Sequence, residues 1–191
     1  AASDVYKRQV PVRPNFFRAA TNNDVENKYG YRYGKWLTAS LYAKCEFVGV
    51  SKGDCSCKVE YAYDLPNLQD EKVHLVYEVY GDGKIIVDMS YQPVVSEIEM
   101  PVFGLIFQLY KDMEEVNYYG FGPEENYIDR NKGALLGKYT YQVTDNLTPY
   151  LYPQECGNRT HVRELSVAGE NTKLKIKGED FEFSALHYTP S

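Results

Sequence analysis

The chain has 191 residues, of which 43% are hydrophobic and 15% aromatic, and its formal net charge is −6. This length fits one domain whose core buries about 70% of the unfolded surface. The acidic balance, without a long basic run, argues against nucleic acid as a partner. No apolar stretch approaches the ~18 residues that span a bilayer, so no membrane partner is expected.

The segment of residues 16–24, FFRAATNND, is the first that combines aromatic, basic and Asx side chains. Arg18 follows two phenylalanines, and Asn23 and Asp24 carry groups that turn or cap a backbone. We therefore predict Arg18, Asn23 and Asp24 as pocket-lining or substrate-binding residues. The alternative is that the Asx side chains only bond their own backbone. The one helix predicted is short, around residues 35–40.

The chain contains four cysteines. Cys55 and Cys57 share their parity with Val59, Tyr61 and Tyr63, which predicts one inward-facing strand row. Packing in such a row explains both thiols without any chemistry. No His or Cys cluster with zinc spacing accompanies them, so no metal site is predicted in this chain.

Alternating apolar and polar residues predict strands over residues 73–79 and 85–91, and the Gly-Asp-Gly turn at 81–83 joins them into a hairpin. Further strand patterns cover residues 103–109, 116–121, 174–176 and 181–185. Prolines separate these strands, and no linker or internal repeat divides the chain. The pattern predicts an all-β protein, a single large antiparallel β-sandwich domain over residues 10–191.

The segment of residues 117–130, NYYGFGPEENYIDR, is the most informative in the chain. Its Gly-Pro step ends a predicted strand, and Glu125, Asn126, Asp129 and Arg130 then project from an irregular loop. Carboxylates, amides and a guanidinium beside aromatic rings suit a sugar, and we predict these residues as substrate-binding or pocket-lining. The alternative is a loop-pinning network in which Arg130 is clamped by Asp129 or Glu155.

The third segment, residues 148–163, reads TPYLYPQECGNRTHVR. Its prolines favour an extended backbone, and Glu155, Arg159 and His161 are its candidate pocket residues. His161 is expected to be a packed or surface histidine more readily than a base. Cys156 is explained most simply as a small filler.

These three segments together resemble the C-terminal β-sandwich domain, or small chain, of the β-galactosidases of glycoside hydrolase family 2. The resemblance runs from about Asn15 to Tyr188 and departs from the family pattern at Ala20, Asn22 and Cys156. It implies a sandwich of the galactose-mutarotase-like (supersandwich) type. It also implies that the chain is truncated at its C-terminal side relative to the family. Residues 1–9 do not belong to the resemblance and are expected to be a non-native leader.

The resemblance implies that the parent enzyme hydrolyses terminal non-reducing β-D-galactose residues. A retaining glycosidase needs two carboxyl groups about 5–5.5 Å apart. The family's pair lies in a separate catalytic barrel, so this chain is expected to carry no catalytic residue. Its expected role is to buttress the barrel and shape the substrate pocket. The tyrosines expected at that seam are Tyr118, Tyr119, Tyr127, Tyr150 and Tyr152.

The same resemblance implies the partners and cofactors. Magnesium, with sodium as a second candidate, is expected in the parent's catalytic domain and none in this chain. The partners expected are a β-galactoside and the catalytic barrel of the same polypeptide, with the parent a homo-oligomer. Because no targeting signal is recognised, a cytoplasmic location is favoured over a periplasmic one.

Two other functions stay open at this stage. A carbohydrate-binding module would bind galactosides without catalysis. An aldose epimerase would need a general acid and a general base around a sugar ring, and His161 with Glu155 or Glu125 is the motif-borne pairing that could supply them.

Overall fold

The computed structural model describes residues 12–66, 68, 71–93, 99–152 and 154–189. The predicted leader, residues 1–9, lies outside them. The chain divides into two compact units, which are described separately. Unit 1 comprises Ala1–Arg18 and Asp24–Phe107, and unit 2 comprises Ala19–Asn23 and Gln108–Ser191. The prediction of one domain over residues 10–191 is not tested by this division and stays a prediction.

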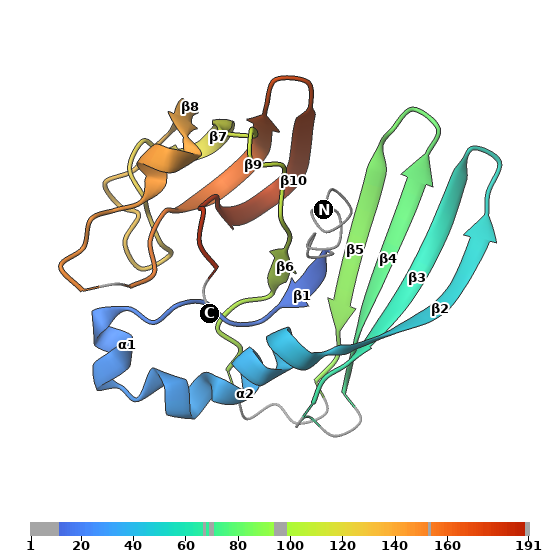
Figure 1. Ribbon diagram of the computed structural model, residues 1–191, viewed down its shortest axis with the longest axis horizontal. Coiled ribbons are helices and arrows are strands. Elements are labelled where there is room, and N and C mark those ends of the chain that lie inside the picture. The colour runs from blue at the N-terminus through green and yellow to red at the C-terminus, as the bar shows by residue number, and fades with distance from the viewer. Residues whose placement is uncertain (1–11, 67, 69–70, 94–98, 153, 190–191) are drawn as a thin grey trace, which may run out of the picture. The chain divides into compact units, whose positions relative to one another are not determined.

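Unit 1 is built around one antiparallel sheet with the strand order β2-β3-β4-β5 (Figure 1). A two-stranded ribbon of β1 and β6 and a long helix, α2, accompany it. The elements are β1 (Arg13–Asn15), α1 (Asn22–Glu26, at the boundary of the units), α2 (Tyr29–Tyr42), β2 (Lys44–Lys52), β3 (Ser56–Asp64), β4 (Lys72–Tyr80), β5 (Ile85–Tyr91) and β6 (Gly104–Ile106).

The core of unit 1 lies where α2 meets one end of this sheet. Val73 and Leu75 on β4 are fully buried, and they cluster with Phe16 and Trp36. The indole Nε1 of Trp36 donates to the Glu99 carbonyl at 2.9 Å, so the ring is both packed and hydrogen-bonded. These contacts attach the helix to the sheet.

The helix α2 is longer than the sequence predicted. It begins at Tyr29, whereas the prediction covered residues 35–40 only. The residues buried on its inner side are Tyr29, Trp36, Ala39 and Ser40. The spacing from Tyr29 to Trp36 is close to two helical turns, so both side chains lie on the same side of the helix. Glycines and tyrosines in its first turns are weak helix formers, and they hid this periodicity.

Unit 2 is a second antiparallel sheet, with the strand order β10-β9-β7-β8 (Figure 1). Its core gathers on one face around Val116, Tyr118, Val162, Leu165 and Val167. The elements are β7 (Glu115–Gly122), β8 (Leu135–Gln142), the 3₁₀ helix η2 (Val143–Asn146), β9 (Asn158–Ala168) and β10 (Lys173–Ser184).

The all-β fold class is confirmed, because antiparallel sheets make up most of the described structure, as an all-β sandwich requires. The mutarotase-like subtype stays a prediction. The hairpin is confirmed as β4 and β5, and residues 116–121 lie in β7. No helix in the described part of the chain is both long and apolar enough to cross a membrane.

Several local predictions were wrong. Residues 174–176 and 181–185 do not form separate strands, because β10 runs through both and absorbs two register shifts on the way. Of residues 103–109, only Gly104–Ile106 pair, with β1. Cys55 is exposed because it precedes β3, although Cys57 and its row do lie in that strand.

Replacing Leu75 with Ala is expected to lower the free energy of unfolding of unit 1 by about 3 kcal/mol, because it leaves a cavity under α2. Trp36 is the single tryptophan of the chain and packs in this core. Its fluorescence during denaturant titration therefore measures the loss. Ile86→Ala, at a side chain that is 41% exposed, is the control and should cost less than about 1 kcal/mol. Equal losses would contradict this description of the core.

Candidate functional site

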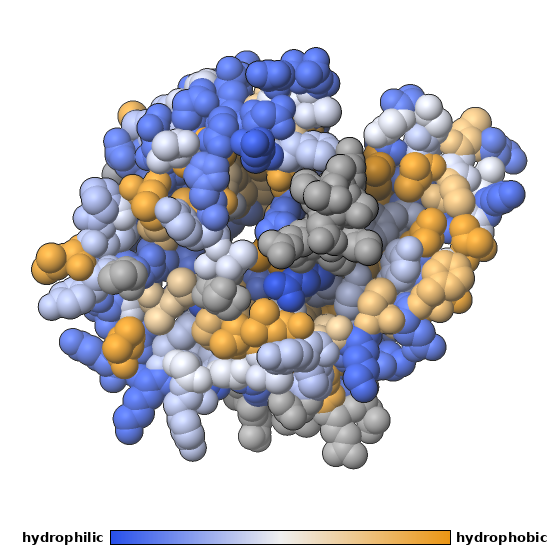
Figure 2. All heavy atoms as spheres, viewed as in Figure 1, coloured by the Kyte–Doolittle hydropathy of each residue, from blue (hydrophilic) through white to orange (hydrophobic). Residues whose placement is uncertain are grey.

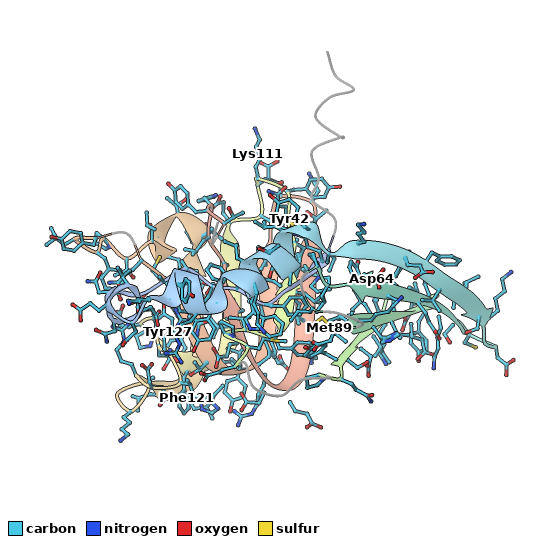
Figure 3. The ribbon with its side chains drawn as sticks, turned by 90° about the horizontal axis from the view of Figure 1, so that it is seen from below. Tyr42, Asp64, Met89, Lys111, Phe121 and Tyr127 are labelled. Atoms are coloured by element: carbon cyan, nitrogen blue, oxygen red, sulfur yellow. The ribbon has the colours of Figure 1, made fainter. Side chains whose placement is uncertain are left out.

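The candidate site is an open pocket in unit 2, at the place where β7 ends. Gly122 has no side chain there because a Cβ atom would lie only 2.8 Å from Cδ2 of Tyr139. Pro123 follows and starts the loop that carries the polar cluster (Figure 3, where Phe121 and Tyr127 are labelled). The pocket has a volume of about 440 Å³. It is lined by Gly122, Pro123, Glu124, Glu125, Asn126, Asp129, Arg130, Lys132, Gly133 and Ala134.

The Glu125 carboxylate is the centre of the hydrogen bonds behind this pocket. Its Oε2 accepts from Oγ1 of Thr148 at 2.8 Å and from the Gly157 N–H at 2.7 Å. Its Oε1 accepts from Nη2 of Arg130 at 2.9 Å and from the Tyr150 hydroxyl. One side chain therefore joins the pocket loop to both ends of the 148–157 segment.

The electrostatics of Glu125 favour the charged carboxylate. Burial alone would raise its pKa, since its side chain is only 11% exposed. The hydrogen bonds from Tyr150, Gly157 and Thr148, with the positive charge of Arg130, outweigh burial, and the pKa lies below its ordinary value. At neutral pH this group is an ionised hydrogen-bond acceptor.

Asn126 fixes the pocket loop to β9. Its Nδ2 donates to the carbonyls of Phe121 and Glu124, both at 3.0 Å. Its Oδ1 accepts from the backbone N–H of Thr160 at 3.0 Å and from the Thr160 hydroxyl at 2.5 Å. The side chain is 2% exposed, and these contacts use its polar atoms to hold the loop.

Arg159 supports the same loop from inside the unit 2 core. Its Nε donates to the Tyr118 hydroxyl at 3.1 Å, and that hydroxyl donates to the Pro123 carbonyl at 3.4 Å. The guanidinium also lies 5.1 Å from the ring centre of Tyr141. Tyr118, expected at an exposed seam, is 3% exposed because it lies on the inward parity of β7. Arg159 and Tyr118 are therefore core residues under the pocket.

The first and third sequence segments meet in unit 2. The backbone N–H of Ala19 donates to Oε2 of Glu155 at 2.8 Å, and the Glu155 N–H donates to the Ala20 carbonyl at 3.3 Å. The Asn22 N–H donates to Oε1 of Gln154 at 3.1 Å. Glu155 therefore ties together segments more than a hundred positions apart.

Other predicted residues lie elsewhere. Arg18 and Asp24 form an ion pair of 2.6 Å in unit 1, where the guanidinium lies 5.0 Å from the ring centre of Tyr29. Nδ1 of His161 lies 3.0 Å from Oδ2 of Asp180. His161 also packs on Phe121 with 4.5 Å between ring centres. An epimerase would need His161 to pair with Glu125 or Glu155, whereas these contacts pair it with Asp180 and Phe121.

Four predicted residues thus line one pocket: Glu125, Asn126, Asp129 and Arg130. Arg130 is held by Glu125 in a network that fixes the loop, so the predicted clamp of Arg130 by Asp129 or Glu155 was wrong. The sugar-binding roles of the predicted residues stay predictions.

The sequence motifs did not indicate roles for Thr148, Gly157 or Lys132. Gly157 has a backbone φ of 77°. A Cβ atom added at this position would lie only 2.6 Å from Nδ2 of Asn146. Its position within Glu-Cys-Gly-Asn is the signal that could have indicated a special turn. The Thr148 and Lys132 side chains carry no comparable sequence signal.

Comparison with known proteins adds a family. A model described as the β-galactosidase small chain matches residues 3–191. The chain is 37% identical over 175 residues to a β-galactosidase of Streptococcus thermophilus, and the alignment covers 90% of this chain and 17% of the relative. A β-galactosidase of Priestia megaterium is 36% identical over 180 residues, covering 93% of this chain and 17% of the relative. A β-galactosidase of Lactobacillus delbrueckii subsp. bulgaricus is 37% identical over 176 residues, with shares of 91% and 17%.

Replacing Glu125 with Gln is expected to destabilise unit 2 by about 2 kcal/mol at pH 7, because the amide cannot accept from all the donors around it. The folded-state pKa of Glu125 is lowered, so its charge contributes fully above the ordinary value of 4.5. That contribution is lost as the pH falls through the folded-state pKa. The difference between Glu125→Gln and the wild type should therefore shrink in acid.

Hydrogen exchange of peptides from residues 123–134 and 148–157, measured between pH 3 and pH 7, tests this prediction. Glu124→Gln is the matched control, since Glu124 is the exposed neighbour that lines the same pocket. It should change exchange little at any pH. A Glu125→Gln effect that grows toward low pH would show that the sign is wrong.

Proposed function

The chain belongs to the β-galactosidase small chain family, and we propose that it is an accessory domain of a β-galactosidase. It spans 17% of the length of each of the three relatives named above. The proposed parent hydrolyses terminal non-reducing β-D-galactose residues, and this domain buttresses the catalytic barrel of the same polypeptide and shapes one wall of the substrate pocket.

The observation that carries this proposal is the use of Glu125 as a structural acceptor. A general acid in a glycosidase needs a raised pKa, whereas the pKa of Glu125 is lowered. A nucleophile needs a free carboxylate oxygen directed at the anomeric carbon. Both oxygens of Glu125 are instead engaged by donors from Thr148, Gly157 and neighbouring side chains. The site holds its loop in one shape, which suits a pocket wall.

The pocket also has groups suited to sugar hydroxyls. Glu124, Asp129 and Lys132 line it and are available at its surface because the loop beneath is fixed by Asn126 and Glu125. Carboxylates accept hydroxyl hydrogens and ammonium groups donate to hydroxyl oxygens. Holding such groups on a rigid loop lowers the ordering cost of binding. A β-galactoside held partly by this wall is the proposed ligand.

The remaining partners are proposals that follow from the parent enzyme. Magnesium, with sodium as a second candidate, is assigned to the catalytic domain of the parent. In the described ranges of this chain, no three His, Cys, Asp or Glu side chains form a group suited to a metal ion. We further propose a homo-oligomeric parent and a cytoplasmic location.

A carbohydrate-binding module without catalysis is the second candidate. The open pocket of about 440 Å³ with exposed polar residues favours it. The epimerase alternative has no comparable support, because His161 pairs with Asp180. The accessory domain and the carbohydrate-binding module both predict sugar binding, and only the parent's activity separates these two candidates.

The pure chain is expected to release no nitrophenol from nitrophenyl β-galactoside, because the bond-breaking carboxylates belong to another domain. A spectrophotometric assay with the Streptococcus thermophilus relative as positive control measures this. Turnover that rises in proportion to the chain's concentration and survives repeated purification would contradict the accessory role.

Galactose titrated into the chain is expected to shift the NMR signals of the loop at residues 123–134, because that loop lines the pocket. Asp129→Ala should weaken the shifts several-fold by removing an acceptor. Asp145→Ala, at an exposed residue of η2, is the control and should leave them unchanged. Shifts confined to other segments would remove the pocket from the proposal.

A further inference from the structure

Asn146, the last residue of η2, is a buried polar side chain that the description of the pocket has not yet used. It is 6% exposed. Its Nδ2 donates to the Gly157 carbonyl at 3.1 Å and to the Ala185 carbonyl at 3.0 Å. Both acceptors lie outside the pocket loop at residues 123–134. One amide group therefore joins the end of the 148–157 segment to the residues that follow β10.

Gly157 is enclosed by these neighbours. Its φ of 77° lies in the left-handed region, which glycine adopts without a steric clash. A Cβ atom there would lie 3.0 Å from Cδ2 of Leu186, in addition to its clash with the Asn146 amide. The two side chains thus fill the space beside the glycine, and the hydrogen bond from Asn146 holds its carbonyl in place.

The conformation of Gly157 reaches the pocket through its N–H, which donates to Oε2 of Glu125 at 2.7 Å. Because peptide units are planar, φ sets the angle between the plane that carries a residue's N–H and the plane that carries its carbonyl. Holding the carbonyl at this φ therefore directs the N–H at Glu125. Glu125 in turn holds Arg130 on the pocket loop at 2.9 Å.

The residues that follow β10 are attached to η2 at two points. We name residues 185–187 the post-β10 segment. Besides the bond from Asn146 to Ala185, Nε2 of His187 lies 3.1 Å from Oε1 of Glu114 and 3.4 Å from Oγ1 of Thr144. Hydrophilic side chains gather at the β9–β10 turn, at the top of Figure 2, whereas the apolar Leu186 packs beside Gly157. The post-β10 segment is therefore part of the support behind Glu125.

We propose that Asn146 is a positioning residue of the pocket. Together with the post-β10 segment it aims the Gly157 N–H at Glu125, and through that carboxylate it sets the shape of the pocket loop and its affinity for a sugar. The inference rests on the proposed function, because it takes the pocket to be the sugar site. It deepens that function by making the pocket depend on residues that do not line it.

Two neighbours in η2 provide matched variants. Asn146→Asp keeps the size of the side chain but turns a carboxylate toward two carbonyl oxygens. Asp145→Asn makes the reverse change at the exposed neighbour. In the 191-residue chain, Asn146→Asp should raise amide hydrogen exchange in residues 123–134 about fivefold or more and weaken galactose binding several-fold in an NMR titration. Asp145→Asn should change both by less than about twofold. Unchanged exchange in Asn146→Asp would overturn the proposal.

Two further variants separate positioning from a general loss of stability. Val143 is buried in η2 and packs in the core of unit 2. Val143→Ala should lower the denaturant midpoint of the chain and leave exchange of the pocket loop unchanged under native conditions. Leu186→Ala removes the side chain beside Gly157 without removing a hydrogen bond. It should raise exchange of the loop at least about twofold, and it supplies the test if Asn146→Asp does not fold. Equal effects of Val143→Ala and Leu186→Ala on the loop would overturn the proposal.

A double variant tests the route through Glu125. If Asn146 acts on the pocket loop through that carboxylate, Asn146→Asp should add less than about twofold to the loop exchange of Glu125→Gln, because the link is already broken. An effect as large as in the wild-type background would show that Asn146 reaches the loop by another route and would overturn the proposal.

Hydrogen exchange is measured without sugar, so the two proposals can fail separately. If Asn146→Asp loosens the loop but galactose shifts none of its signals, the positioning role stands and the sugar pocket of the proposed function is contradicted. If galactose binds at the loop equally well in Asn146→Asp and the wild type, the sugar pocket stands and the positioning role is overturned.

Discussion

The geometry of unit 2 depends on one partly buried carboxylate that is surrounded by more donors than a surface ion pair would have. Glu125 receives hydrogen bonds from a backbone N–H, two hydroxyls and a guanidinium. Burial of a charge is costly unless such partners compensate it, so the segments that supply the donors are fixed wherever the carboxylate is ionised. The pocket loop takes its shape from this constraint, with Asn126 and Arg159 securing it to the sheet below.

The same constraint explains why the site suits support better than catalysis. A carboxylate that must stay charged to hold the pocket loop and the 148–157 segment together cannot also exchange a proton with a leaving group without loosening them. The side chains left for a ligand, Glu124, Asp129 and Lys132, lie at the rim of the pocket. In unit 1, α2 covers Val73 and Leu75 on one face of the sheet, and the other face carries ion-paired charges.

The sequence predicted regular features well. Period-two alternation located the hairpin of β4 and β5 and the course of β7, because local side-chain parity sets these strands. It also found the segment that contains Glu125 and Arg130. It did not find the length of α2, whose first residue, Tyr29, is buried and packs on Phe17, nor the continuity of β10 through its register shifts. Those features depend on tertiary contacts that no local pattern encodes.

The sequence predicted which residues make up the site, but not the hydrogen bonds between them. The motif indicated which residues gather around the Gly-Pro step, but it did not indicate which carboxylate holds Arg130, which is Glu125 within the same segment. The remaining donors to Glu125 come from Thr148, Tyr150 and Gly157, which follow β8 in the chain, so no local pattern could predict them. Arg159 was predicted as a ligand residue and is buried, in a stretch of β9 that lies opposite a register shift of β10, where strand parity is ambiguous. Tyr118 was predicted at an exposed seam and is buried, because it lies on the inward parity of β7. The sequence suggested Glu125 or Glu155 as the partner of His161, but His161 lies beside Asp180 on β10.

The central claim is that this chain shapes a sugar pocket without breaking a glycosidic bond. A 2-deoxy-2-fluoro-β-galactoside with an activated leaving group traps the nucleophile of a retaining galactosidase as a covalent adduct. Intact-mass spectrometry of the chain after incubation tests the claim most directly, with the Streptococcus thermophilus relative labelled in parallel. The account predicts an unchanged mass for this chain. A stoichiometric fluorogalactosyl adduct on one of its carboxylates would contradict it.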